Sequence, residues 1–195
     1  MIVLGLTGSI AMGKTTTAKM FRNAGIPVHD ADATVHGLYA GRAVPLIEAA
    51  FPGVVSDGIV DRKKLSVCVL GNQQALAKLE AIVHPLVQEE ENLFLQRARQ
   101  SGARYALLDI PLLFETGADK RVRATILVTA SAEVQRQRAL ARLGMTDEKL
   151  RSILEKQMAD EDKRKLAHFI IDTGRGMDPA RRTAAAILRT LSFMV

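Results

Sequence analysis

The residues nearest the N-terminus that could do chemistry are Gly8, Gly13, Lys14 and Thr15, which fit the spacing G-x-x-x-x-G-K-[ST]. In such a loop backbone amides bind phosphate oxygens, the lysine reaches the terminal phosphates, and the hydroxyl is offered to Mg²⁺. An apolar run typical of a buried strand precedes the loop and a helical pattern follows it, which is the context that the motif needs. We therefore expect ATP and Mg²⁺ here, with the nucleotide-binding residues Gly8, Ala11, Met12, Gly13, Lys14, Thr15 and Thr16.

Asp109 is the second candidate, because it closes the hydrophobic run "YALLD". A carboxylate at the end of a buried strand in a P-loop protein is placed to orient Mg²⁺ or its waters. Thr15 and Asp109 are therefore the predicted metal-side residues. The alternative is that Asp109 only caps the segment after the strand.

Two further carboxylates lie in the sequence "DAD", at the end of another short apolar run. If the strand continues through it, Asp30 and Asp32 face the same side. Phosphoryl transfer to an alcohol needs a carboxylate that accepts or orients the hydroxyl proton, so Asp32 is a candidate base and Asp30 a metal-side or positioning group. Either residue could instead be a helix N-cap.

Gln135, Arg138 and Arg142 are spaced by three and four residues, which places them on one stripe of a helix. A mobile basic segment could close over ATP, supply charge to the transferring phosphoryl group and exclude water. A solvated helix face is the alternative. Arg136 lies off the stripe and is predicted at the surface, and the charged region 136–165 is predicted to be a solvated helical hairpin.

Composition limits the class of protein. The chain has 195 residues, 48% hydrophobic and 25% charged, which fits one folded core with inserted lobes. The net charge of +6 favours anionic partners, but charges of both signs are mixed and aromatic residues make up only 4%, so a nucleic acid partner is not expected. With no long apolar run and no secretory signal in "MIVLGLTG", we expect a cytoplasmic protein without a membrane partner. The single cysteine, Cys68, is predicted in the core.

Apolar runs that alternate with helical patterns predict an α/β protein with a parallel sheet, helices on both faces and a ligand crevice at the carboxyl ends of the strands. Strands are predicted in residues 2–7, 26–32, 104–115, 124–129 and 168–172, and helices in 13–24, 33–51, 61–70, 131–143 and 178–193. The helical pattern 72–100 is predicted to break at Pro85, with His84 as an N-cap. Thr146 is predicted as another N-cap, with Met145 and Leu150 as its hydrophobic staple.

Ordered motifs along nearly the whole chain resemble those of the dephospho-CoA kinase family. They are "TGSIAMGKTT", "DAD", "DGIVDR", "HPLV", "DIPLLFE", the Q-x-x-R-x-x-x-R that begins at Gln135, "QM" at 157–158 and "IDTG" at 171–174. A P-loop alone is shared by many unrelated enzymes, whereas the ordered set is specific, especially HPLV followed by PLLFE.

The resemblance implies an α/β fold of the P-loop NTPase type: a three-layer sandwich with a five-stranded parallel sheet, in a single domain over 1–195. It also implies a helical acceptor-binding lobe near 60–100 and a helical lid near 140–165. The implied reaction is ATP-dependent phosphorylation of the ribose 3′-hydroxyl of dephospho-CoA, which gives CoA and ADP in the last step of coenzyme A biosynthesis.

Matching positions assign roles by the same resemblance. Asp32 resembles the carboxylate that activates or positions the acceptor hydroxyl, and Arg138 and Arg142 resemble lid-side arginines. The predicted catalytic residues are Asp32, Lys14, Arg138 and Arg142, and the predicted acceptor-binding residues are Asp30, Asp32, His84, Pro111, Leu112 and Glu115. For His84, a structural N-cap is an equal alternative.

The chain departs from the family's usual G-G-x-G-S-G-K-S, because Ser9 and Ala11 stand where glycines are expected. Both residues need a negative φ, or modest strain if φ is positive. Thr173 stands where an asparagine on the adenine side is more usual.

Two other functions stay open on the sequence. One is a P-loop kinase with another small-molecule acceptor, such as a nucleoside or a sugar, which the HPLV and PLLFE segments argue against. The other is a nucleotide-dependent switch or a nucleic-acid-associated ATPase, which the positive charge would suit. The oligomeric state does not follow from the sequence.

Overall fold

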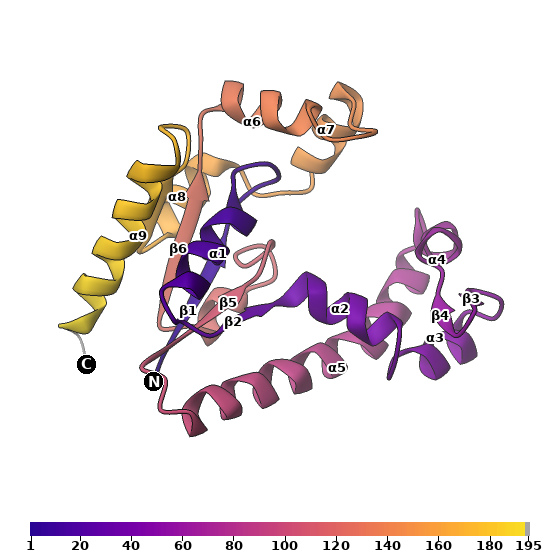
Figure 1. Ribbon diagram of the computed structural model, residues 1–195. Helices are drawn as coiled ribbons and strands as arrows, with labels where there is room; N and C mark the ends of the chain where they lie inside the picture. The colour runs from indigo at the N-terminus through magenta and orange to yellow at the C-terminus, as the bar shows by residue number, and fades with distance from the viewer. Residues whose placement is uncertain (194–195) are drawn as a thin grey trace. The chain divides into compact units, whose positions relative to one another are not determined.

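The computed structural model describes residues 1–193. Within them, five strands form one sheet in the order β2-β5-β1-β6-β7 (Figure 1). The pairs β1–β5, β1–β6 and β6–β7 are parallel, and every residue of β5 and β6 is buried, as expected for a sheet covered by helices. The strands are β1 (Ile2–Thr7), β2 (Val28–Asp30), β5 (Tyr105–Asp109), β6 (Ala124–Thr129) and β7 (Phe169–Asp172).

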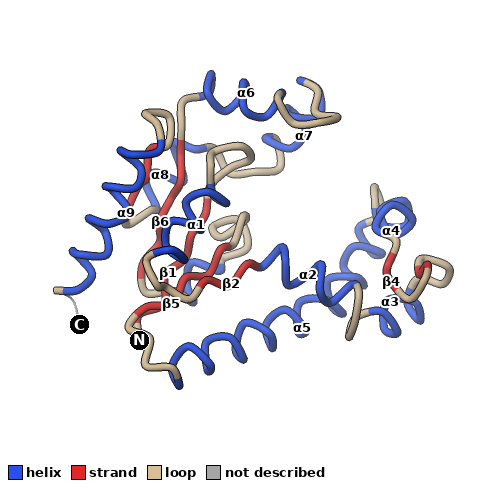
Figure 2. The backbone as a smooth tube through the Cα atoms, viewed as in Figure 1, coloured by secondary structure: helices blue, strands red, loops and turns tan. Residues whose placement is uncertain are grey.

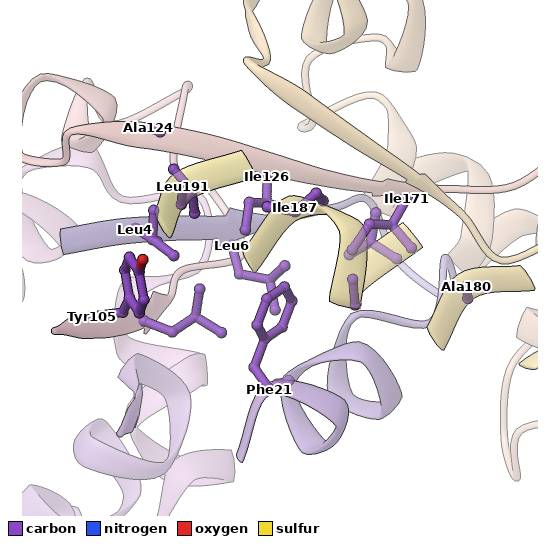
Figure 3. Packing of buried hydrophobic residues seen from close by; sticks show 14 residues of the cluster. Leu4, Leu6, Phe21, Tyr105, Ala124, Ile126, Ile171, Ala180, Ile187 and Leu191 are labelled. Carbon is purple, nitrogen blue, oxygen red and sulfur yellow. The ribbon is translucent and has the colours of Figure 1, made fainter. Parts of the chain in front are cut away.

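The chain divides into two compact units, and the sheet core belongs to the first, which joins residues 1–28 to the chain from 101 onward. Phe21 of α1 and Ile187 of α9 pack on Leu6 and Ile126 of the sheet (Figure 3). Burial of each such side chain stabilises the fold by roughly 1.5–3 kcal/mol. The helices here are α1 (Lys14–Asn23), the 3₁₀ helix η1 (Ala118–Arg121), α6 (Ala132–Leu140), α7 (Asp147–Leu154), α8 (Asp160–Leu166) and α9 (Met177–Ser192).

The second unit, residues 29–100, is built around one long helix (Figure 2). Helices α2, α3 and α4 each contact α5, and their buried side chains, such as Ile47 and Leu65, form a core with Leu79 and Val83 of α5. The elements are α2 (Ala31–Tyr39), α3 (Val44–Ala50), β3 (Val55–Ser56), β4 (Ile59–Val60), α4 (Arg62–Val69) and α5 (Gln73–Gln100). The helical lobe expected near 60–100 is therefore part of a larger unit that begins at residue 29.

Helix α5 corrects the prediction of a break at Pro85, because the helix runs through it. A proline inside a helix removes one hydrogen bond and costs about 3 kcal/mol or more. Pro85 and Ala81, whose carbonyl loses its partner, are both exposed, so water can solvate that carbonyl. Packing of the opposite face against α2, α3 and α4 offsets the remaining cost, and His84 is an interior helix residue and not an N-cap.

Three smaller predictions were also wrong, and one short hairpin was not predicted. The expected helix 33–51 is interrupted between Tyr39 and Val44, and strand β5 ends at Asp109, followed by turns. Cys68 is exposed, because α4 buries Leu65 on its inward face. Finally, "SDGI" forms a tight antiparallel hairpin, in which Asp57 and Gly58 take φ values of +52° and +76°, as an Asp-Gly turn requires.

The predicted cap at Thr146 is confirmed. Its side chain accepts a hydrogen bond from the amide of Lys149, and Met145 packs with Leu150. No helix in the described part of the chain is long and apolar enough to cross a lipid bilayer.

Candidate active site

The P-loop joins β1 to α1, and two glycines determine its path. A Cβ atom on Gly8 would lie 2.5 Å from the carbonyl oxygen of Val128, so glycine alone lets the loop pass this close to β6. Gly13 has a φ of +95°, which glycine adopts without steric cost. Gly13 directly precedes α1, so the first-turn amides of this helix lie at the loop, where they can bind phosphate.

The two positions where glycine is replaced behave differently. Ser9 is outside the left-handed region, whereas Ala11 has a φ of +62° and carries the local strain. The methyl group of Ala11 is buried with Ala139 and Leu150 in a small apolar cluster, which also includes Ile10. At Ala11, the burial of an apolar methyl group therefore partly offsets the cost of the strained backbone.

Lys14 and Asp109 meet at the end of the sheet, a contact that was not predicted from the sequence. The Nζ atom of Lys14 lies 2.6 Å from Oδ1 of Asp109, whose side chain is only 3% exposed. This contact aligns the P-loop lysine with the carboxyl end of β5. Thr15 and Thr16 are exposed in the first turn of α1.

The oxygen donors here suit Mg²⁺, which commonly binds one or two carboxylates together with substrate phosphates and waters. Asp109 supplies a carboxylate and Thr15 an exposed hydroxyl. Among residues 1–193, no group of three or more His, Cys, Asp and Glu side chains could hold a metal ion. The donor set therefore fits an ion that is bound jointly with a nucleotide.

The "DAD" segment differs from the prediction of two carboxylates on one strand face. Strand β2 ends at Asp30, whose side chain accepts a hydrogen bond of 3.0 Å from the amide of Ala33 and so caps α2. Asp32 lies in the first turn of that helix and is exposed. The strand stops because the Asp30 cap makes the following residues helical.

Asp32 and His84 line the same pocket in the second unit, with a volume of about 240 Å³. The pocket lies between α2 and α5, and its walls are mainly apolar. Val35 and Tyr39 come from α2, and Leu79, Glu80, Val83 and Val87 come from α5. A few polar side chains at a mainly apolar pocket are typical of a small-molecule site.

The other predicted acceptor residues lie in the turn after β5, in the first unit. The carbonyl of Pro111 accepts a hydrogen bond of 2.9 Å from the hydroxyl of Thr7, and the side chain of Leu112 is exposed. Glu115 instead turns inward, where its Oε1 lies 2.8 Å from Nζ of Lys163 and accepts a 2.9 Å hydrogen bond from the amide of Met158.

The groups around Glu115 favour the ionised form of its carboxyl group. Burial alone raises the pKa of a carboxyl group, but the hydrogen bonds from Lys163 and from the backbone amides of Glu115 and Met158 outweigh it. The pKa of Glu115 is therefore lowered from its usual value.

The predicted stripe on α6 is not a solvated face. Gln135 is buried, and its Nε2 donates a 2.9 Å hydrogen bond to the carbonyl of Ile10. Arg138 donates to the hydroxyl and the carbonyl of Thr173, at 2.8 and 2.9 Å. Arg142 is exposed beyond the end of the helix, and Arg136 forms a surface ion pair with Asp147, as expected.

Sequence reasoning missed the inward roles of Lys163, Gln157 and Thr173. Lys163 is fully buried although it lies in the charged run "DEDKRKL". The Oε1 atom of Gln157 accepts a 3.2 Å hydrogen bond from the amide of Ile10, and the hydroxyl of Thr173 donates to the carbonyl of Met12 at 2.8 Å. The sequence of α8 could have indicated a buried charged residue. This helix has almost no apolar side chain, so it must bury a polar or charged one in order to pack.

Comparison with known proteins places this geometry in a family. The family model for dephospho-CoA kinase matches residues 2–178. The curated dephospho-CoA kinase of Mesorhizobium japonicum is 62% identical over 191 residues, which cover 98% of this chain and 97% of that protein. The chain belongs to the dephospho-CoA kinase family. The resemblance inferred from the ordered motifs is thereby confirmed, and with it the prediction of a kinase.

Solved structures support the fold. The crystal structure of TT1252 from Thermus thermophilus has a TM-score of 0.85 at 34% identity and covers 97% of each chain. A dephospho-CoA kinase from Campylobacter jejuni has a TM-score of 0.66 at 23% identity, with 96% of each chain covered, and shows the same fold. The predicted P-loop kinase fold with a five-stranded parallel sheet is confirmed.

Proposed function

We propose that the protein transfers the γ-phosphoryl group of ATP to the ribose 3′-hydroxyl of dephospho-CoA, which gives CoA and ADP. Family membership supports the reaction class and its place at the end of coenzyme A biosynthesis. The observation that carries the proposal is the P-loop whose Lys14 meets the strand-end carboxylate of Asp109. The proposal places the protein in the cytoplasm, where ATP is available. It includes neither a nucleic acid nor a membrane as partner.

On the nucleotide side, the amides of the loop from Ala11 to Thr16 bind the phosphates, and Lys14 neutralises charge on the terminal ones. Thr15 and Asp109 hold Mg²⁺, directly or through its waters. When bound, the ion neutralises charge on the phosphate oxygens and orients them. Asp109 also orients the ammonium of Lys14 before ATP arrives, since the two groups are already 2.6 Å apart.

On the acceptor side, Asp32 accepts the proton of the ribose hydroxyl. The hydroxyl oxygen bonds to the γ-phosphorus, the bond from that phosphorus to the β–γ bridging oxygen breaks, and ADP leaves. Asp30 contributes by capping α2, which fixes the helix turn that carries Asp32. The apolar pocket that Asp32 shares with His84 supports an acceptor-binding role for the second unit.

The segment near 140–165 acts as the lid in this proposal. Arg138 and Arg142 supply positive charge to the transferring phosphoryl group. Arg142 is exposed, whereas Arg138 must exchange its hydrogen bonds to Thr173 for hydrogen bonds to the substrate. Pro111 and Leu112, in the turn after β5, bind the acceptor in this proposal, as the matching motif positions imply.

The test is a steady-state assay with ATP and a panel of acceptors: dephospho-CoA, a nucleoside, shikimate and gluconate. The proposal expects rapid transfer to dephospho-CoA alone, with the new phosphate located on the 3′-oxygen by ³¹P NMR. Inactivity on dephospho-CoA would overturn it. ATP hydrolysis stimulated by nucleic acid, without any phosphorylated acceptor, would favour an ATPase instead.

A further inference from the structure

Side chains between Gln135 and Lys163 contact three consecutive residues of the P-loop, Ser9 to Ala11. Both backbone groups of Ile10 are bound by glutamines, because Gln135 donates to its carbonyl at 2.9 Å and Gln157 accepts from its amide at 3.2 Å. The methyl group of Ala11 packs in the apolar cluster that α6 and α7 form. The first half of the loop is therefore anchored by side chains from both ends of the segment that follows β6.

Ser9 has a partner of a different kind. The Nζ atom of Lys163 donates to its hydroxyl at 3.3 Å and lies 2.8 Å from Oε1 of Glu115. Lys163 is fully buried and Ser9 is 5% exposed, so the ammonium group is shielded from water at this position. One buried cation thus joins α8, the turn after β5 and the P-loop.

A buried lysine is costly unless it is paired and hydrogen-bonded, so its presence needs a reason. Charge pairing with Glu115 provides compensation, and the amide of Met158 fixes the same carboxylate oxygen. The ammonium group has three N–H donors, and the hydroxyl of Ser9 accepts one of them, which ties the P-loop to the ion pair. An apolar pair of similar volume is often as stable as a buried ion pair, which favours a role for this cation in setting a conformation.

We propose that Lys163 is a positioning residue for ATP: its ammonium, held by Glu115, fixes Ser9 and with it the conformation in which the P-loop receives phosphate. The strained φ of +62° at Ala11 lies two residues from this contact and needs such support from its surroundings. Glu115 then acts through Lys163, in addition to any contact with the acceptor. The inference rests on the proposed function only in naming ATP as the ligand.

The experiment measures binding of a non-hydrolysable ATP analogue with Mg²⁺, by calorimetry and without acceptor. Removing one charge-assisted contact should weaken binding about tenfold. Lys163→Met is expected to do so, and Ser9→Ala is expected to weaken binding in the same direction while the ion pair stays intact. Lys165→Met on the same helix, whose side chain is 73% exposed, is the matched control and should bind like the wild type.

A double variant separates positioning from stability. Lys163→Met alone leaves the Glu115 carboxylate without its cation and should lower the melting temperature. Adding Glu115→Gln removes that charge, so the double variant should regain thermal stability but should not regain affinity for the analogue. Recovery of both properties would overturn the proposal, as would wild-type affinity in Ser9→Ala and in the double variant.

These outcomes are independent of the acceptor. A wild-type protein that is inactive on dephospho-CoA but binds the analogue would contradict the proposed function and leave the role of Lys163 to be decided by the variants. A protein active on dephospho-CoA, whose variants all bind like the wild type, would contradict the role of Lys163 alone.

Discussion

The nucleotide side of the protein and the unit that carries Asp32 orient their functional groups by different physical means. In the first unit, Lys14 is held by Asp109 and Arg138 by Thr173, through specific polar contacts below 3 Å. In the second unit, Asp32 and His84 are exposed on helices that pack through an apolar core. Charged groups are thus oriented one by one on the first side, and through the placement of whole helices on the second.

The difference follows from what each side must do. Stabilising a highly charged phosphate group depends on donors that are already fixed when the charge arrives. An acceptor with a large organic body is recognised more by an apolar pocket with a few polar groups. Substitutions of polar residues in the first unit should therefore change ATP binding and transfer, whereas core substitutions in the second should change stability.

The largest combined effect on ATP binding and turnover is expected for Lys14→Met. Loss of the ammonium removes the cation that meets the terminal phosphates, so turnover should fall by about 10²–10³-fold or more and ATP should bind more weakly. Lys19→Met on the same helix, at an exposed position, is the control. A Lys14→Met protein that binds ATP tightly and stays active would remove the P-loop assignment. Steady-state kinetics and calorimetry provide both numbers.

The comparison can be sharpened with Ile47→Ala in the core of the second unit. Ile47 is fully buried, and truncation of such a side chain costs about 2–5 kcal/mol. Urea unfolding should show this loss, while the affinity of the folded protein for an ATP analogue stays at the wild-type value. The comparison would fail if Ile47→Ala also weakened binding of the ATP analogue at low temperature, where the variant is folded. The core of the second unit would then influence nucleotide affinity.

The pH dependence of stability tests the polar contacts of the first unit. Because the pKa of Glu115 is lowered by folding, the ion pair of Glu115 with Lys163 contributes stability above the unfolded value of 4.5. That contribution is lost as the pH falls through the folded value. The gap in melting temperature between wild type and Glu115→Gln should be wide at pH 7 and should close as the pH falls through the lowered pKa of folded Glu115. A gap that does not change with pH would show that the charge is irrelevant.

The smallest effect is expected for Ala11→Gly. Glycine relieves a left-handed φ that costs alanine roughly 1–2 kcal/mol. Glycine also destabilises the fold in two ways. It removes a buried methyl group worth about 0.8 kcal/mol, and it raises the entropy of the unfolded chain, which costs about 0.4–1 kcal/mol. These contributions nearly cancel, so the free energy of unfolding should change by about 1 kcal/mol or less. A loss of several kcal/mol would mean that the apolar contacts of Ala11 are worth more than its area suggests.

Local pattern was sufficient for much of the first unit. The apolar runs 2–7 and 124–129 coincide with β1 and β6, and the cap at Thr146 formed as its neighbours indicated. The position of Asp109 at a strand end was also predicted, because a P-loop and a neighbouring parallel strand end at the same edge of a sheet, but its ion pair with Lys14 was not predicted.

The failures occur where distant contacts override local preference. Pro85 stays within α5 because three helices pack on the other face, and nothing near Pro85 in the sequence shows this. Lys163 was expected in solvent, since its compensating charge, Glu115, lies 48 positions earlier. Asp30 and Asp32 do not share a strand face, because the cap at Asp30 starts a helix.

The most direct test of the account is Asp32→Asn. This single substitution should separate the turnover on the acceptor from the binding of ATP. The account predicts a turnover on dephospho-CoA lower by about 10²–10⁴-fold with an unchanged dissociation constant for the ATP analogue, since a proton acceptor acts in the transition state. Asp57→Asn, at an exposed turn in the same unit, should leave both values at the wild-type level. Wild-type turnover in Asp32→Asn would contradict the account, and so would a loss of analogue binding as large as the loss of turnover.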